Sequence, residues 1–247
     1  LQGIPEAMSS ARCSFPTVQA ACETVMAVIQ YGLPVARIEL LDADVVKAVN
    51  AYSKLTLPET PLLLLEFHGS EAGVVEQAET FGMLAEEFGG TGYAATTTPE
   101  ERNKLWQARH DGYWAVLALR PGCKAVATDV CVPISRLADA VVAAQARAEE
   151  LKLIAPIVGH AGDGNFHASL LIDMDDADEV ARGEAFVSWL AELAISMDGT
   201  CTGEHGIGQG KRAYLSKELG AAVDVMATVK AALDPDNILN PGKILPG

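Results

Sequence analysis

Two histidines stand on either side of a short glycine-rich turn, at His160 and His167. The turn, Gly162-Asp163-Gly164-Asn165, lies between apolar runs typical of β-strands, Leu153–Val158 and Ala168–Ile172. Folded as an antiparallel hairpin about its centre, this segment places His160 opposite His167. Side chains paired in this way have Cβ atoms about 4.5–5.5 Å apart on one face of the sheet. Two imidazoles in that arrangement can bind one metal ion.

A polar pair at the mouth of a hairpin is the alternative interpretation of these two histidines. For Asp163 and Asn165 we expect no role beyond the turn, since Asp and Asn tolerate positive φ. The metal site is favoured for the histidines because three of the five in the chain, His160, His167 and His205, fall within the two glycine-rich segments.

A third ligand is available in the second glycine-rich segment, Thr202-Gly203-Glu204-His205-Gly206. Two histidines and one carboxylate leave positions on a metal open, which is typical of catalytic rather than structural sites. Glu204 alone would be read as a surface carboxylate at the start of a helix. Its interpretation as a ligand depends on the adjacent His205 and on the surrounding glycines.

Composition limits the class of protein. The 247 residues are 49% hydrophobic, which suits a folded globular chain with a substantial core. The formal net charge of −15 disfavours nucleic acid and anionic membrane surfaces as partners, because both are bound by clustered Lys and Arg. The longest apolar run, Leu62–Leu65 with Phe67 beyond it, is far too short to span a bilayer.

The cysteines indicate reduced thiols in an intracellular setting. They are odd in number, scattered, and form no Cys-x-x-Cys pair. Each is expected to be a small buried residue rather than a ligand, including the one near the predicted site. The five are Cys13, Cys22, Cys123, Cys131 and Cys201.

Hydrophobic periodicity and breakers predict alternating strands and helices. Strands are expected over Arg12–Phe15, Pro34–Leu41, Pro61–His68, Thr91–Ala95, Lys124–Val132, Leu153–Gly159 and Phe166–Ile172. Helices are expected over Thr17–Gln30, Asp42–Lys54, Glu71–Phe88, Glu100–Leu119, Ser135–Lys152, Asp176–Met197, Gly206–Leu219 and Ala221–Leu233, followed by a turn-rich segment, residues 234–243.

The required antiparallel hairpin makes the fold class α+β. We expect a mostly antiparallel sheet covered by helices on one face, with a ferredoxin-like order of elements as far as Ala95. No Gly-x-Gly-x-x-Gly follows a strand, and Gly206–Lys211 lacks the residues of a phosphate-binding loop. The chain therefore has no motif with which to hold a dinucleotide by itself.

Several stretches together resemble a known family. They include the two glycine-rich segments with their flanking residues, 158–167 and 199–208. The other stretches are residues 34–39, 65–70, 105–110, 120–124, 128–135 and 233–243. These are similar to the C-terminal cap domain of FAD-linked oxidases, the family that includes D-lactate dehydrogenase, a glycolate oxidase subunit and D-2-hydroxyglutarate dehydrogenase. They resemble most the cytochrome-type D-lactate dehydrogenase branch, and the likeness covers nearly the whole chain.

The resemblance implies a division of the chain and a partner. It implies a first ferredoxin-like half over residues 1–98, a second half with the metal hairpin over 99–200, and a helical C-terminal segment over 201–247. FAD would be held mainly by an N-terminal FAD-binding domain that this sequence does not contain, with Asn240 at the interface. The chain alone would then be inactive. Electrons would pass on to a cytochrome or quinone, in the bacterial cytoplasm or the mitochondrion.

The resemblance also implies roles for individual residues. A divalent metal, zinc or manganese, would lie on His160, His167 and Glu204. His205 would be the catalytic base. Arg109, which otherwise would be read as a charge on a helix surface, would bind the carboxylate of a 2-hydroxy acid substrate.

Two departures from the family pattern narrow the class of substrate that the resemblance implies. A lysine expected near Ala127 in the hydroxyglutarate branch has no counterpart, nor does an asparagine expected at Ser169. Both departures favour a short monocarboxylate such as D-lactate. The alternatives are a glycolate oxidase subunit, a flavin-independent metalloenzyme such as a hydrolase or non-haem iron oxygenase, and a non-catalytic metal-binding module.

Overall fold

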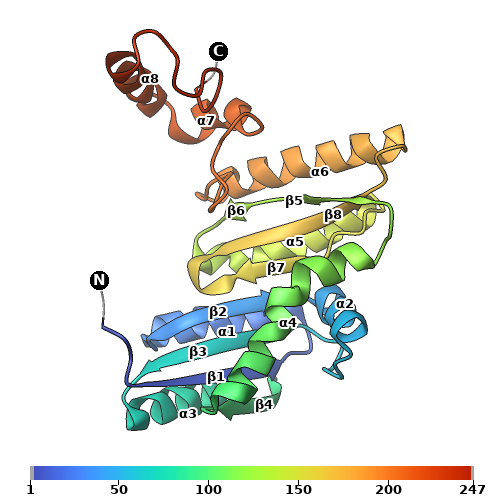
Figure 1. Ribbon diagram of the computed structural model, residues 1–247, viewed down its shortest axis with the longest axis vertical. Helices are drawn as coiled ribbons and strands as arrows, with labels where there is room; N and C mark the ends of the chain where they lie inside the picture. The colour runs from blue at the N-terminus through green and yellow to red at the C-terminus, as the bar shows by residue number, and fades with distance from the viewer. Residues whose placement is uncertain (1–2, 246–247) are drawn as a thin grey trace.

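A single antiparallel sheet of eight strands forms the centre of the computed structural model, which describes residues 3–245 (Figure 1). The strand order is β4-β1-β3-β2-β7-β8-β5, and the short β6 also pairs with β8. The strands are β1 Ala7–Ser14, β2 Val35–Leu41, β3 Leu62–Gly69, β4 Thr91–Thr96, β5 Lys124–Ala127, β6 Val130–Cys131, β7 Ile157–His160 and β8 Asn165–Ile172. The expected fold class is confirmed.

The strand order shows how the sheet is assembled. Its first four strands lie in the order β4-β1-β3-β2 with antiparallel neighbours, as in a ferredoxin-like unit. The pairing of β2 with β7 joins this unit to the later strands, with Glu39 beside His160. The division at residues 98 and 200 stays a proposal. Its outer limits, residues 1 and 247, lie outside the described residues.

Four of the eight described α-helices begin where a polar side chain caps the first turn. Thr17, Asp42 and Ser70 each accept a hydrogen bond from the backbone N–H three residues later. The helices are α1 Val18–Tyr31, α2 Ala43–Ser53, α3 Glu71–Glu87, α4 Pro99–Ala118, α5 Leu137–Glu150, α6 Ala177–Ser196, α7 Arg212–Leu219 and α8 Ala222–Leu233.

One predicted helix begins later than expected. Residues 208–211 form turns, residues 206–207 have no regular structure, and α7 starts only at Arg212. Gly206 and Gly208 have φ values of 77° and 51°, in the left-handed region that a right-handed helix cannot contain. The prediction of a helix from Gly206 was therefore wrong, and the residues beyond His205 form a loop.

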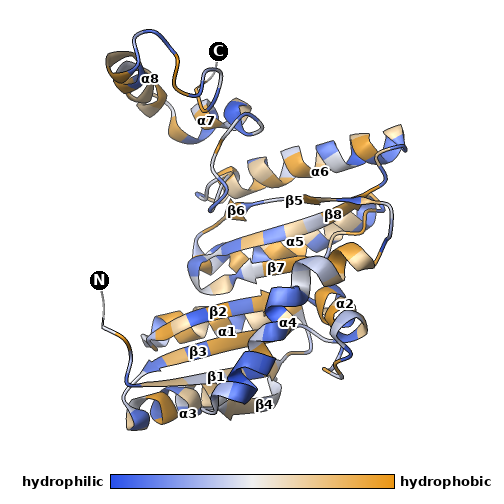
Figure 2. Cartoon of the chain, viewed as in Figure 1, coloured by the Kyte–Doolittle hydropathy of each residue, from blue (hydrophilic) through white to orange (hydrophobic). Residues whose placement is uncertain are grey.

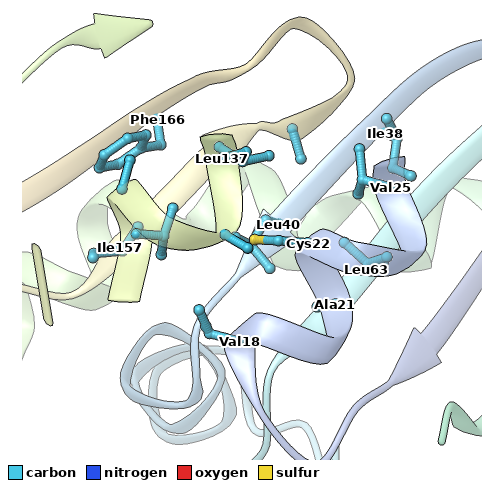
Figure 3. Close-up of a cluster of buried hydrophobic side chains, with 14 of the residues drawn as sticks. Val18, Ala21, Cys22, Val25, Ile38, Leu40, Leu63, Leu137, Ile157 and Phe166 are labelled. Atoms are coloured by element: carbon cyan, nitrogen blue, oxygen red, sulfur yellow. The ribbon is translucent and has the colours of Figure 1, made fainter. Parts of the chain in front are cut away.

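The main core lies between the sheet and a layer containing α1, α3 and α5. Leu40 and Leu63 point to this side and are fully buried, which stabilises the fold by about 1.5–3 kcal/mol for each such side chain. Figure 3 shows where α1 and α5 meet the strands in this core, with Val18, Ala21, Cys22, Val25, Ile38, Leu137, Ile157 and Phe166 labelled.

Helices cover part of the other face as well, so the expectation of helices on one face was wrong. Leu41, Leu62 and Leu64 form a second core with residues of α2 and α4, including Trp106. The run Leu62–Leu65 is apolar at consecutive positions because β3 is buried on both sides, as such runs indicate. Hydrophilic residues are frequent along α4 (Figure 2), which crosses this second face.

The C-terminal helices α7 and α8 lie beyond the β5–β6 end of the sheet (Figure 1). Among their residues only Leu215 and Val223 are buried apolar side chains. Across the described range, no helix combines the length and apolar character that a bilayer crossing requires.

Candidate metal centre

The β7–β8 hairpin carries both predicted histidine ligands, but its register differs from the prediction. His160 is paired with Asn165, and His167 with Val158. The reason is the turn, in which Ala161–Asp163 form a 3₁₀ turn and Gly164 adopts a φ of 76°. His160 and His167 are therefore diagonal neighbours on one face, with ring centroids 5.8 Å apart.

Hydrogen bonds aim both imidazoles in the same direction. The Nδ1 atom of His167 lies 2.9 Å from the carbonyl oxygen of Thr128, which can only accept, so Nδ1 carries the proton. The Nδ1 atom of His160 lies 2.7 Å from Glu39 Oε1. Each ring thus engages its Nδ1 and turns its Nε2 toward Glu204, and orientation of this kind is usual for histidines that bind metals.

Glu204 completes the group. Its Oε1 lies 3.2 Å from His167 Nε2 and 3.7 Å from His160 Nε2, and the three ligand atoms are all within 4.8 Å of one another. A tetrahedral zinc ion with bonds of about 2.0–2.1 Å separates its ligand atoms by about 3.3–3.4 Å. The geometry and the donor set therefore fit a divalent metal.

Asp129 holds the loop that presents Glu204. This carboxylate is fully buried, and its oxygens accept hydrogen bonds from the backbone N–H groups of Glu204 and His205 and from the hydroxyl of Thr202. Lys211 Nζ lies 3.2 Å from Asp129 Oδ2. These hydrogen bonds to Asp129 hold the loop of residues 202–205 in place, and they position Glu204 beside the β7–β8 hairpin.

Gly203 allows this close approach. A Cβ atom there would lie 2.0 Å from Asn165 Nδ2 and 2.8 Å from Asp129 Oδ1. Asn165 in turn donates from Nδ2 to Asp129 Oδ1 at 2.9 Å. The expectation that Asn165 serves only the turn was therefore wrong, because its buried amide anchors Asp129, whereas Asp163 is an exposed turn residue.

A second trio, Asp129, His167 and His205, also brings ligand atoms within 4.8 Å of one another. It does not fit a metal ion. The Asp129 oxygens already accept several hydrogen bonds, and His167 Nδ1 donates to Thr128. Of the two trios found among the described residues, the one with His160 and Glu204 offers ligand atoms that are free of other hydrogen bonds.

His205 lies beside the three candidate metal ligands and is not one of them. Its ring stacks on that of His167, with centroids 5.2 Å apart and planes inclined by 18°. Its Nε2 is 3.7 Å from Glu204 Oε1, and the side chain is about half exposed. An accessible imidazole at this place can exchange a proton with a molecule bound next to Glu204.

Arg109 reaches the same site from α4. Its Nε donates to Glu39 Oε2 at 2.9 Å, and Glu39 also binds His160. Among the described residues this is the hydrogen bond that its side chain makes, so the Nη groups on the other edge of the guanidinium face no protein acceptor. Two parallel N–H donors of this kind suit a carboxylate.

Electrostatics in the site follow from these contacts. Hydrogen bonding to Glu39 raises the pKa of His160, whereas burial lowers the pKa of His167. Burial alone would raise the pKa of Glu39, but the hydrogen bonds from His160 and Arg109 and their charges outweigh it and lower the pKa. Glu39 is therefore ionised at neutral pH and His167 is neutral, as a metal ligand must be.

The sequence reasoning missed Glu39 and Asp129. Glu39 stands between Ile38 and Leu40 in an apolar strand, and Asp129 interrupts the run Lys124–Val132. An acid inside an apolar strand signals a buried charge with a partner, and this signal could have been read from the sequence.

Two other positions considered in the sequence are not among the candidate ligands. Asn240, expected at a flavin interface, is exposed in the C-terminal loop with a φ of 47°. Cys201 is fully buried beside the site, and burial raises its pKa to about 12, which suits the expected structural role. All five cysteines are free thiols.

Comparisons with known proteins agree with this structure. Residues 4–244 match the family described as FAD linked oxidases, C-terminal domain. The chain is 50% identical over 246 residues to "Probable D-lactate dehydrogenase, mitochondrial" of Danio rerio, covering 99% of this chain and 50% of that protein. It is 40% identical over 247 residues to "D-lactate dehydrogenase (cytochrome), mitochondrial" of Arabidopsis thaliana, covering 100% of this chain and 44% of that protein.

The fold also has a solved counterpart. The 4-ethylphenol oxidase from Gulosibacter chungangensis superposes with a TM-score of 0.75 over 99% of this chain and 55% of that one, at 16% identity. The chain spans about half the length of the curated relatives it matches. On the family match and the identities to these relatives, the chain belongs to the FAD linked oxidases and comprises their C-terminal domain.

Proposed function

We propose that this chain is the substrate- and metal-binding domain of an FAD-dependent D-2-hydroxy acid dehydrogenase that oxidises D-lactate to pyruvate. The observation that carries the proposal is the convergence of His160 Nε2, His167 Nε2 and Glu204 Oε1 beside Arg109 and His205. The names of the relatives support D-lactate as the substrate.

The chain's own residues account for binding and proton transfer. The Nη groups of Arg109 would bind the substrate carboxylate, next to the α-hydroxyl that is oxidised. His160, His167 and Glu204 would hold a zinc or manganese ion. That ion, when bound, lowers the pKa of the hydroxyl as it does that of water. His205 Nε2 takes the hydroxyl proton. A flavin on the partner domain would supply the acceptor for the hydride of the substrate carbon, and the product would be the 2-oxo acid.

The substrate class rests on two positions that depart from the family pattern. Ala127 and Ser169 are direct cross-strand partners between β5 and β8. Ser169 lies two residues beyond His167 on β8, so it shares the face that carries the metal ligands. A small pair at this place offers no charged group for a second carboxylate, which favours a short monocarboxylate.

A flavin-binding domain is the partner that the proposal requires. Helix α8 exposes an apolar row at Val225, Val229 and Leu233, spaced four residues apart, and Ile238 and Leu239 follow it. Exposed apolar patches of this kind mark surfaces that pack against another body. We assign this surface to the flavin-binding domain, and electrons leave that domain for a cytochrome or quinone.

The proposed function is tested by assaying the flavin-loaded protein with an artificial electron acceptor. D-Lactate should be oxidised faster than glycolate and far faster than D-2-hydroxyglutarate, and the metal-free form should be inactive. Oxidation of D-2-hydroxyglutarate in preference would contradict the substrate. Activity of this chain without flavin would instead favour a self-sufficient metalloenzyme.

For Arg109→Lys we expect a KM for D-lactate about 10-fold higher or more, corresponding to about 1.4 kcal/mol of lost binding, with a smaller change in kcat. The reason is that lysine offers no two-pronged contact to a carboxylate. Steady-state kinetics of the flavin-loaded variant measure the changes in KM and kcat separately. An unchanged KM would show that Arg109 is a structural residue.

A further inference from the structure

Two buried glutamates lie on the face of the sheet that carries the metal ligands, on the adjacent strands β2 and β3. Each is paired with one arginine and one histidine. Glu66 binds Arg37 Nη2 and His68 Nε2, both at 2.9 Å. Glu39 binds Arg109 and His160. The two carboxylates are alike in burial and in the kinds of charged partner, although Glu66 also accepts a hydrogen bond from the hydroxyl of Ser10. Only the cluster of Glu39 includes residues of the proposed site.

Glu39 uses a different oxygen for each partner. Its Oε1 lies 2.7 Å from His160 Nδ1, and its Oε2 lies 2.9 Å from Arg109 Nε. The side chain is 8% exposed, so water competes little for either oxygen. The pairing of β2 with β7 places Glu39 directly beside His160, which makes this bridge a consequence of the sheet register.

We infer that Glu39 is a positioning residue that joins the metal ligand His160 to the substrate-binding Arg109. One oxygen keeps the proton of His160 on Nδ1 and points the bare Nε2 at the metal. The other oxygen fixes the guanidinium so that its Nη groups face the substrate carboxylate. This inference rests on the proposed function, and it adds that a single carboxylate aligns the two binding groups.

Exchanging the carboxylate for an amide tests the bridge because an amide cannot accept at both ends. If the Gln oxygen accepts from Arg109, its NH₂ group donates to His160 Nδ1 and forces the ring proton onto Nε2, where it blocks the metal. If the oxygen accepts from His160, the NH₂ group faces the N–H of Arg109. In either orientation, one of the two hydrogen bonds that Glu39 accepts is lost.

For Glu39→Gln we expect weaker binding of zinc and weaker binding of the substrate. Zinc titrated into the metal-free chain by calorimetry should bind about 10–100-fold more weakly, the usual effect of removing a partner of a metal-bound histidine. In the flavin-loaded protein the KM for D-lactate should also rise. Glu66→Gln is the matched control, since it removes the same charge from a cluster with the same kinds of charged partner, and it should leave zinc affinity and KM as in the wild type.

Thermal unfolding separates positioning from support of the fold. Both Gln variants should lose some stability, but only Glu39→Gln should lose zinc affinity. If Glu39→Gln does not fold, Glu39→Asp is tested instead, because it keeps two acceptor oxygens on a shorter side chain. Its loss of zinc affinity should be smaller.

Equal zinc affinity in the wild type and the Glu39 variants would overturn the inference while leaving the metal site intact. The inference would also be overturned by an equal loss of zinc affinity in Glu39→Gln and Glu66→Gln. Failure of the wild type to bind zinc would instead overturn the proposed function on which the inference rests.

Discussion

Replacing His205 with alanine is expected to lower kcat for D-lactate by about 10²–10⁴-fold, the usual contribution of a positioned general base. His205 is about half exposed and its Nε2 lies 3.7 Å from Glu204 Oε1, at the open side of the metal ligands. Because its ring is not one of the three ligands, zinc affinity should change little. Loss of the proton acceptor should therefore affect turnover far more than metal binding.

His110 provides a matched control for this variant. It lies on α4 next to Arg109 in the sequence, and its side chain is exposed. His110→Ala should keep wild-type kcat, and both variants should be compared in the flavin-loaded protein with the same artificial acceptor. Near wild-type turnover in His205→Ala would eliminate the role of base. A large loss of zinc would make His205 a ligand instead.

Replacing Asp129 with alanine is expected to lower the free energy of unfolding by about 3–5 kcal/mol, as removal of one partner of a buried ion pair does. The change removes the carboxylate partner of the Lys211 ammonium group and of the Asn165 amide, each of which keeps only a backbone carbonyl, and it frees the backbone N–H groups of Glu204 and His205. These same contacts lower the pKa of Asp129 against the effect of burial.

The Asp129 variant should also lose zinc affinity, because the loop that presents Glu204 is no longer held. Denaturant unfolding and zinc calorimetry measure the two effects. Asp163→Ala removes an exposed carboxylate from the hairpin turn and should change stability by no more than about 0.5 kcal/mol. If Asp129→Ala were no less stable than Asp163→Ala, the account of the loop would be wrong.

Much of this fold follows from local pattern. The apolar periodicity and the capping residues Thr17, Asp42 and Ser70 placed most elements within a few residues of their observed ends. The error at Gly206–Leu219 arose because apolar spacing does not reveal a left-handed φ, which Gly206 and Gly208 adopt.

The candidate site was predicted despite a wrong register. The hairpin turns one residue earlier than its centre suggests, so His160 pairs with Asn165 rather than His167. Each partner thereby shifts by two positions, and side chains alternate with a period of two, so both histidines stay on the same face. Their Nε2 atoms lie close together because both histidines are on the same face of the sheet, although they are not cross-strand partners.

The residues that orient the ligands were not predicted because their contacts are distant in the sequence. Glu39 meets His160 across 121 positions, and Asp129 meets His205 across 76. Nothing in the local pattern specifies that β2 pairs with β7, and it is this pairing that sets Glu39 beside His160. An acid within an apolar strand showed only that some partner was required.

The central claim, that His160, His167 and Glu204 bind one divalent metal, is tested most directly by metal content. The purified chain is loaded with zinc or manganese, dialysed against metal-free buffer and measured by elemental analysis. Wild type and His68→Ala should keep metal in an amount equal to that of the chain, while His160→Ala, His167→Ala and Glu204→Ala should lose most of it. A wild type without metal, or ligand variants that keep it, would contradict the claim.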